Sequence, residues 1–111
     1  MENNSYFKDY RSFRSFNSDR CGKSTLFENE FILAGLNCLN PGQSMEKHAH
    51  DVQNRFYLVL EGEGLITLNN ETNKASQGMV IWVPSGCVHK INNNGEEQMV
   101  LLVGISPAHS D

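Results

Sequence analysis

The sequence predicts an all-β fold, either a sandwich or a barrel. Short segments rich in Leu, Ile, Val and Phe alternate with turn signals roughly every six to twelve residues along the 111-residue chain. Pro84 and nearly all the glycines fall between these segments, where a positive φ or a missing amide hydrogen does no harm. Gly35 lies inside a predicted strand, which is typical of a β-bulge. With no internal repeat and enough apolar residues for one core, the chain is expected to form a single domain.

The first twenty residues precede the strand pattern. They are polar, with aromatic residues interspersed at Tyr6, Phe7, Tyr10, Phe13 and Phe16. The serines and asparagines between them disfavour a stable helix. Two interpretations stay open, an irregular arm whose aromatic side chains cap the barrel and an arm that packs on a second subunit. We therefore divide the chain into an N-terminal arm (1–20), a barrel (21–106) and a tail (107–111).

Most of the chain after residue 24 is predicted to form strands. They are residues 25–27, 30–39, 44–50, 55–61, 65–68, 74–76, 79–83, 88–92 and 98–105. Turn signatures separate them, most clearly at 40–42, 61–64 and 84–86. The run at 79–83 is apolar throughout, which predicts a strand buried on both faces with Met79 and Trp82 packed in the barrel.

Composition argues against several classes of function. The net charge is −4 without a basic face, so nucleic-acid binding is unsupported, and no DNA-binding segment fits beside the barrel. No apolar run approaches the ~18 residues of a membrane span, and the first residues lack a signal-peptide core. Three widely spaced cysteines, Cys21, Cys38 and Cys87, are typical of reduced thiols. We expect a cytoplasmic protein with no nucleic-acid or membrane partner.

Three histidines form a candidate metal site. His48 and His50 are one residue apart on a predicted strand, so their side chains project from the same face. His89, from a distant strand, would complete a facial set of imidazoles, which suits a divalent transition metal with open coordination positions. The alternative is that each is a buried core histidine. His109 lies in the tail and is interpreted as a bystander.

These histidines also carry a family resemblance. Gly42, His48, His50 and Gly62 are spaced as in the first motif of the cupin family. The second cupin motif is matched by Gly78, Pro84, Ser85, Gly86, His89 and Asn93. The resemblance implies a double-stranded β-helix, the jelly-roll barrel of small RmlC-like cupins. It also implies a divalent metal (Fe, Mn, Ni or Zn) inside the barrel mouth.

One position departs from the family pattern. The glutamate that is a metal ligand in cupins is replaced by Arg55, which stays protonated and repels a bound cation. Three outcomes are open: Arg55 turns to a carboxylate such as Glu46, it binds an anionic group of a substrate, or the site holds no metal. Glu46 has the same parity as His48 and His50 and could face the same interior.

Three further residues are candidates at this site. Gln53 or Asn54 could supply a weak oxygen ligand in place of the missing glutamate. Tyr57 lines the cavity or is a core aromatic, two residues after Arg55. Arg55, Tyr57 and Glu46 are therefore the predicted substrate-binding residues.

Two functions follow from this site. The first is a metal-dependent, dioxygenase-like enzyme acting on a small anionic substrate. The second is a non-catalytic barrel that binds or senses a small molecule. A metal-independent isomerase is a third class, for which the sequence offers no clear His–Tyr or His–Asp pair. A homodimer is expected, because the aromatic arm carries more apolar surface than a free tail.

Overall fold

A computed structural model of the chain describes residues 5–47 and 52–108. Within these ranges nearly all the regular structure is β, with one short 3-10 helix in the arm. The elements are η1 (Tyr10–Phe13), β1 (Gly22–Glu28), β2 (Leu33–Leu39), β3 (Ser44–Lys47), β4 (Asn54–Glu61), β5 (Glu63–Leu68), β6 (Glu71–Ser76), β7 (Val80–Val83), β8 (His89–Asn92) and β9 (Met99–Ser106). No helix in these ranges is long and apolar enough to span a membrane.

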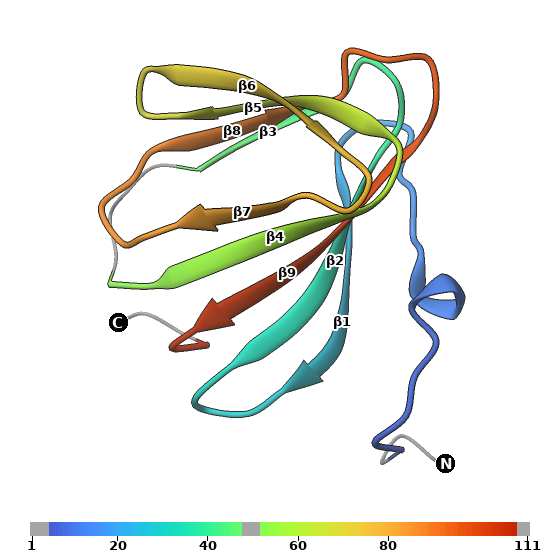
Figure 1. The fold of residues 1–111 in the computed structure, drawn as a ribbon. Helices are drawn as coiled ribbons and strands as arrows, with labels where there is room; N and C mark the ends of the chain where they lie inside the picture. Colours follow the sequence, from blue (N-terminus) through green and yellow to red (C-terminus); the bar gives the residue numbers. More distant parts are fainter. Residues whose placement is uncertain (1–4, 48–51, 109–111) are drawn as a thin grey trace.

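Two antiparallel sheets face each other across the core (Figure 1). The five-stranded sheet has the order β1-β2-β9-β4-β7, and the four-stranded sheet has the order β3-β8-β5-β6. The last strand, β9, lies in the centre of the larger sheet, between β2 and β4. The predicted all-β jelly-roll barrel is confirmed by this arrangement.

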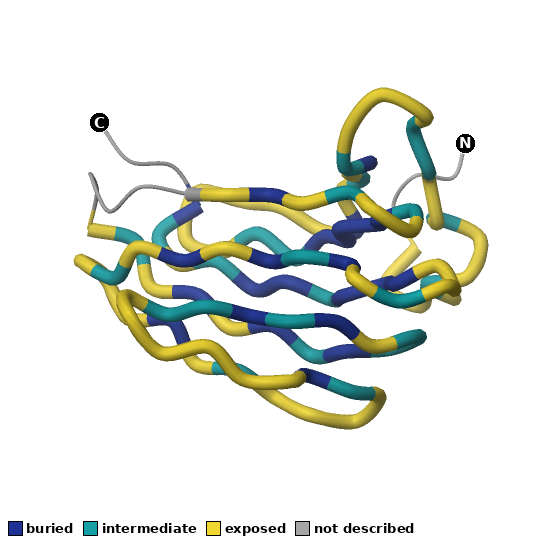
Figure 2. The backbone as a smooth tube through the Cα atoms, turned by 90° about the horizontal axis from the view of Figure 1, so that it is seen from above, coloured by how far each residue is buried: buried dark blue, intermediate teal, exposed yellow. Residues whose placement is uncertain are grey.

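The core lies between the sheets and follows the period-two alternation of the strands. On β4, the inward residues Arg55, Tyr57 and Val59 are buried, and the residues between them are more exposed. Figure 2 shows the same alternation of buried and exposed positions along several strands. The inner cluster is completed by Leu39, Met45, Ile66, Ala75, Val83, Ile91, Met99, Leu101 and Val103.

A second apolar cluster lies on the outer face of the larger sheet. Leu26, Leu36, Cys38 and Val100 form it, and the arm residues Tyr10, Phe13 and Phe16 pack against it. The arm passes so close to β1 that a side chain at Gly22 would collide with the backbone of Ser15. These three aromatic residues therefore cap their own barrel, as one of the two interpretations of the arm predicted, whereas Tyr6 and Phe7 are exposed.

The prediction that residues 79–83 are buried on both faces is wrong. Trp82 is 59% exposed and Met79 is 42% exposed, and only Val83 of β7 is fully buried. The reason is that β7 is an edge strand, paired only with β4, and its outer face is covered by no other described element. An apolar run does not distinguish such a strand from one enclosed on both sides.

Gly35 does lie beside a strand irregularity. The register of β1 against β2 shifts between Thr25 and Phe27, directly after the Thr25–Gly35 pair. A side chain at Gly35 would meet the backbone oxygen of Ser24 at 2.7 Å. The bulge therefore requires glycine here, and the inner face of the sheet has no side chain at this point.

Candidate functional site

Of the three proposed metal ligands, the structure describes His89. It is the first residue of β8 and is only 2% exposed, within the barrel. His48, His50 and the tail residue His109 lie outside the described residues. The geometry of the site is therefore built around His89 and the β4 residues that face it.

His89 is joined to Tyr57 across the two sheets. The Tyr57 hydroxyl and Nε2 of His89 are 2.9 Å apart, and the two rings are tilted at 54° with centroids separated by 5.5 Å. Tyr57 is itself only 1% exposed. Burial raises the pKa of Tyr57, and the nearby Arg55 charge acts in the opposite direction. The hydroxyl therefore stays protonated at neutral pH, which suits it as a hydrogen-bond donor to a neutral imidazole.

Arg55 also faces the barrel interior. Its side chain is 8% exposed, and its Nη2 donates a 2.9 Å hydrogen bond to Oε1 of Gln53. Gln53 in turn donates from Nε2 to the carbonyl oxygens of Pro107 (3.0 Å) and Ala108 (3.1 Å). Within residues 5–47 and 52–108, no carboxylate pairs with Arg55. A buried guanidinium is thus held by a neutral amide that is anchored to the chain after β9.

The expectation that Glu46 faces the same interior is wrong. Glu46 is exposed, and the preceding residue, Met45, is the buried one on β3. Glu46 lies opposite the exposed Lys90 of β8, so the two form a cross-strand pair of opposite charges on the outer face. Alternation along β3 therefore directs Glu46 away from Arg55.

Gln53 and Asn54 both use their side-chain oxygens in other contacts. Oε1 of Gln53 accepts the hydrogen bond from Arg55, and Oδ1 of Asn54 accepts one from the backbone amide of Ser85 at 2.8 Å. These bonds connect the start of β4 to Arg55 and to the turn before β8. Both residues therefore shape the mouth of the barrel, whereas their role as auxiliary metal ligands stays a prediction.

A cavity of about 180 Å³ opens beside Arg55 and Tyr57. It lies between the inner faces of β1, β2, β4 and β9 and Met45 of β3. Its charged lining groups are Arg55 and Lys23, and no carboxylate lines it among the described residues. The field in this cavity therefore favours an anion.

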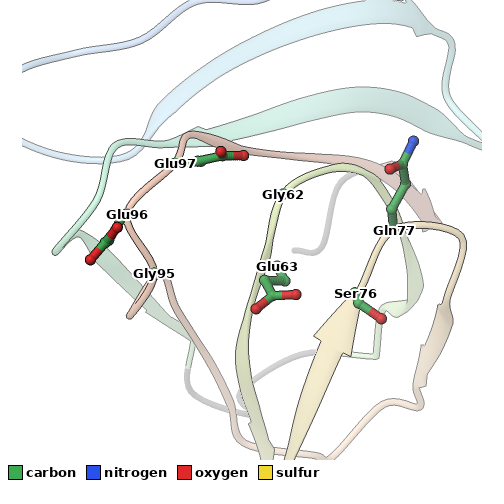
Figure 3. Close-up of a pocket in the computed structure, with 7 residues that line it drawn as sticks. All are labelled: Gly62, Glu63, Ser76, Gln77, Gly95, Glu96 and Glu97. Atoms are coloured by element: carbon green, nitrogen blue, oxygen red, sulfur yellow. The ribbon is translucent and has the colours of Figure 1, made fainter.

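A second hollow lies at the opposite end of β4 and has the opposite charge. Figure 3 shows its lining, which includes Glu63, Glu96 and Glu97. The hollow has a volume of about 670 Å³. Glu63 pairs with Lys74 at 3.3 Å, and both side chains are more than half exposed. Because the eight-residue strand β4 is roughly 25 Å long, this hollow is remote from Arg55. It consists of solvated turns and contains none of the predicted site residues.

Among the described residues, His89 could bind a metal, whereas the charge of Arg55 opposes metal binding. The buried imidazole of His89 is a suitable donor for a transition metal. A metal on Nε2 would have to replace the Tyr57 hydroxyl, because that nitrogen has one lone pair. Arg55 adds a positive charge where the family has a carboxylate, and within residues 5–47 and 52–108 no three His, Cys, Asp or Glu side chains converge.

The Tyr57–His89 pair was not foreseen from the sequence. Tyr57 was a candidate because it follows Arg55 at a spacing of two, and His89 because of its motif position. Their contact depends on how β4 of one sheet lies over β8 of the other, and no local spacing encodes that distance.

Comparison with known proteins gives the same fold. The protein TT1209 from Thermus thermophilus has a TM-score of 0.88 and 29% sequence identity, over 93% of this chain and 98% of that chain. Two curated relatives carry functional names. The oxalate-binding protein of Thermotoga maritima is 33% identical over 67 residues, which are 60% of this chain and 55% of that protein. The gentisate 1,2-dioxygenase of a Ralstonia species is 33% identical over 72 residues, which are 64% of this chain and 20% of that enzyme.

These matches concern the barrel. The chain spans about half the length of the first curated relatives that it matches. The sequence model of the cupin domain matches residues 35–105, from β2 to β9. That range contains the four-stranded sheet, most of the larger sheet apart from β1, and every predicted site residue, and the chain therefore belongs to the cupin family.

Proposed function

We propose that this cupin barrel binds a small organic anion at Arg55, beside a divalent metal held by His48, His50 and His89. The observation that carries the proposal is the burial of Arg55 without a carboxylate partner among the described residues. Removing a charge from water costs several kcal/mol unless an opposite charge or well-placed hydrogen bonds compensate. Its described neighbours, the Gln53 amide and the Tyr57 hydroxyl, carry no opposite charge, so an anion in the cavity would stabilise Arg55.

The chemistry of Arg55 favours a carboxylate as that anion. A guanidinium presents parallel N–H donors that match the two oxygens of a carboxylate. Gln53 engages Nη2 and so helps to fix the plane of the guanidinium, and Arg55 lines the cavity. Oxalate and gentisate, the molecules in the names of the two relatives, are both carboxylates. These names support the class of ligand and not its identity.

The metal part of the proposal rests on the donor set. Three neutral imidazoles without a carboxylate leave most of the charge on the ion, which as a Lewis acid would polarise a bound anion. Fe, Mn, Ni and Zn all accept such ligands. The chain's own residues would orient the anion: Arg55 holds its carboxylate, and Tyr57 donates a hydrogen bond beside it. If the metal is iron, the protein would act as a dioxygenase-like enzyme. If it catalyses no reaction, the barrel would bind or sense the anion.

The Tyr57–His89 pair favours a second candidate. A metal-independent isomerase needs adjacent acid and base groups, and these two side chains lie 2.9 Å apart next to a cavity. Metal content separates the two candidates, because His89 cannot ligate through Nε2 and keep its bond to Tyr57. Elemental analysis of protein purified without chelator or nickel affinity resin is the measurement.

Isothermal titration with butyrate, a monocarboxylate, tests the anion site directly. Wild-type protein should bind it, and Arg55→Gln should weaken binding at least tenfold, which is about 1.4 kcal/mol. Arg11→Gln is the matched control, because Arg11 is exposed on the arm and pairs with Asp9. Equal butyrate affinity in Arg55→Gln and wild type would overturn the proposal.

We also infer a homodimer formed through the outer face of β4 and β7, where Phe56, Val80 and Trp82 are exposed side by side. A contiguous apolar patch of this kind marks an interaction surface. A cytoplasmic location is part of the same proposal. It is supported by the three free cysteines, which form no disulfide among the described residues.

A further inference from the structure

The cavity beside Arg55 contains a second polar group that the proposed function leaves unassigned. Asn37 lies on the inner face of β2, is 5% exposed and lines the cavity. Its neighbours Leu36 and Cys38 face outward into the cluster under the arm, so the amide of Asn37 points inward. Among residues 5–47 and 52–108 its side chain makes no hydrogen bond, and its polar atoms are not sealed in the core but stay accessible from the cavity. A ligand in the cavity can therefore take the hydrogen bonds of this amide in place of solvent.

The sheet register places Asn37 and Arg55 at two ends of the same cavity. Asn37 pairs with Leu101 of β9, and Arg55 pairs with Ile105 on the other side of that strand. Their Cα atoms are thus separated by roughly 13 Å along the strand direction and roughly 10 Å across it. Both residues line the same cavity, so the two side chains and a small ligand together would bridge this separation.

Gly35 provides the space between these two groups. It lies between Thr25 and Val103 in the sheet, and Val103 pairs in turn with Tyr57. Because no side chain is tolerated at Gly35, the wall is recessed there. The volume of about 180 Å³ equals roughly six water molecules at ~30 Å³ each. The cavity therefore suits a molecule well below the size of most drug-like ligands.

Lys23 adds a second positive charge at the Asn37 end. It is the cross-strand partner of Asn37 on the edge strand β1, is exposed, and lines the cavity. The cavity thus has a guanidinium at one end and an amide with an ammonium at the other. An acid with one charged end would satisfy only half of this arrangement.

We propose that the cavity recognises a small dicarboxylate, with one carboxylate on Arg55 and the other on Asn37 and Lys23. This inference rests on the proposed function, because it presumes that Arg55 binds a carboxylate. It adds that Asn37 is the specificity-determining residue, which selects acids with a second anionic end. Lys23, on the edge strand β1, attracts that end of the ligand.

The test compares succinate with butyrate, which have the same four-carbon length and differ in one carboxylate. Wild-type protein should bind succinate at least tenfold more tightly. Asn37→Leu keeps the branched shape of the side chain and removes its polarity, so the succinate-to-butyrate ratio should fall at least tenfold. Lys23→Gln, at an exposed position that does not endanger folding, should lower the ratio about threefold. Lys74→Gln, an exposed lysine on β6, should leave it unchanged.

The outcomes separate this inference from the proposed function. If wild-type protein binds neither acid, the anion site itself is refuted. If butyrate binding depends on Arg55 but the ratio is the same in Asn37→Leu, Lys23→Gln and wild type, only the dicarboxylate inference is overturned. Each titration is repeated after chelator treatment. If chelator treatment abolishes the preference for succinate, the second carboxylate binds the metal and not Asn37. That result would also overturn the role of Asn37.

Discussion

Tyr57 and His89 form a buried hydrogen bond of 2.9 Å that joins the two sheets at the candidate site. The bond uses Nε2 of His89, so any metal at that nitrogen competes with the tyrosine hydroxyl. The same bond couples the ligand cavity, which Tyr57 lines, to the proposed metal ligand. Anion binding, metal binding and the protonation of this pair are therefore linked through one contact.

Tyr57→Phe removes the competitor and should raise metal affinity. A net hydrogen bond contributes about 0.5–1.5 kcal/mol, so the gain should be about two- to tenfold. Titration of chelator-treated protein with zinc, read by a competing indicator, measures it. A lower affinity in Tyr57→Phe would show instead that the hydroxyl helps to orient His89 for the metal.

Arg55→Glu should strengthen metal binding and weaken anion binding. The substitution restores the carboxylate of the family pattern and removes a repelling charge, so metal affinity should rise at least tenfold. Affinity for butyrate should fall in the same variant. An exposed charge would change neither quantity by more than about twofold, and unchanged metal affinity would contradict the cavity-facing placement of Arg55.

Metal loading should depend on His48, His50 and His89. Each alanine substitution should reduce bound metal in elemental analysis, whereas His109→Ala serves as the control with normal loading. Imidazole ligates only when neutral, so loading should decline as the pH falls below about 6. Full loading of His89→Ala would remove that residue from the site.

Trp82→Glu should weaken the proposed dimer. It places a charge in the middle of the exposed apolar stripe on β7, next to its cross-strand partner Phe56. Sedimentation velocity at micromolar concentration should show a shift toward monomer. Phe31→Glu is the control, because Phe31 is also well exposed but lies in the turn between β1 and β2. A wild-type protein that is already monomeric under these conditions would refute the dimer.

The arm should loosen at high pH. The Tyr10 hydroxyl donates a 2.6 Å hydrogen bond to Glu61, and this bond raises the pKa of Tyr10. A raised folded-state pKa means that the stabilisation is complete below the usual tyrosine pKa of about 10 and is lost as the pH rises through the folded value. Thermal melts from pH 8 to 11 should therefore decline less steeply in Tyr10→Phe than in wild type. Tyr6→Phe, at an exposed position, should melt like wild type.

The sequence predicted those features that depend on local spacing. Turns at Gly42, Gly62 and Gly86, all with positive φ, separate the strands near the expected positions. The inward orientation of Arg55 follows from its alternation with Tyr57 and Val59. Which face is the inner one is not local information. On β3 the sequence pattern predicts that Glu46 faces the barrel interior, whereas in the structure Met45 is the buried residue and Glu46 is exposed.

Two other features depend on the assembled sheets. The exposure of Trp82 comes from the edge position of β7, and strand order cannot be read from an apolar run. The cavity between Asn37 and Arg55 is formed by strands β2 and β4, which are separated by β9 from the other end of the chain. Asn37 belongs to no sequence motif. Its place beside the cavity follows only from the register of β2, β9 and β4, which the sequence does not reveal.

The central position of β9 has a consequence for how the protein folds. This strand pairs with β2 and β4, so Leu33 meets Ile105 and Asn54 meets Ser106, contacts that are very distant along the chain. The larger sheet cannot close until residues 99–106 are in place, and the arm has no complete surface to dock on before that. Barrels dominated by such non-local pairs fold on a timescale of milliseconds to seconds. Until then the apolar strands of the amino-terminal half remain open to association with other chains.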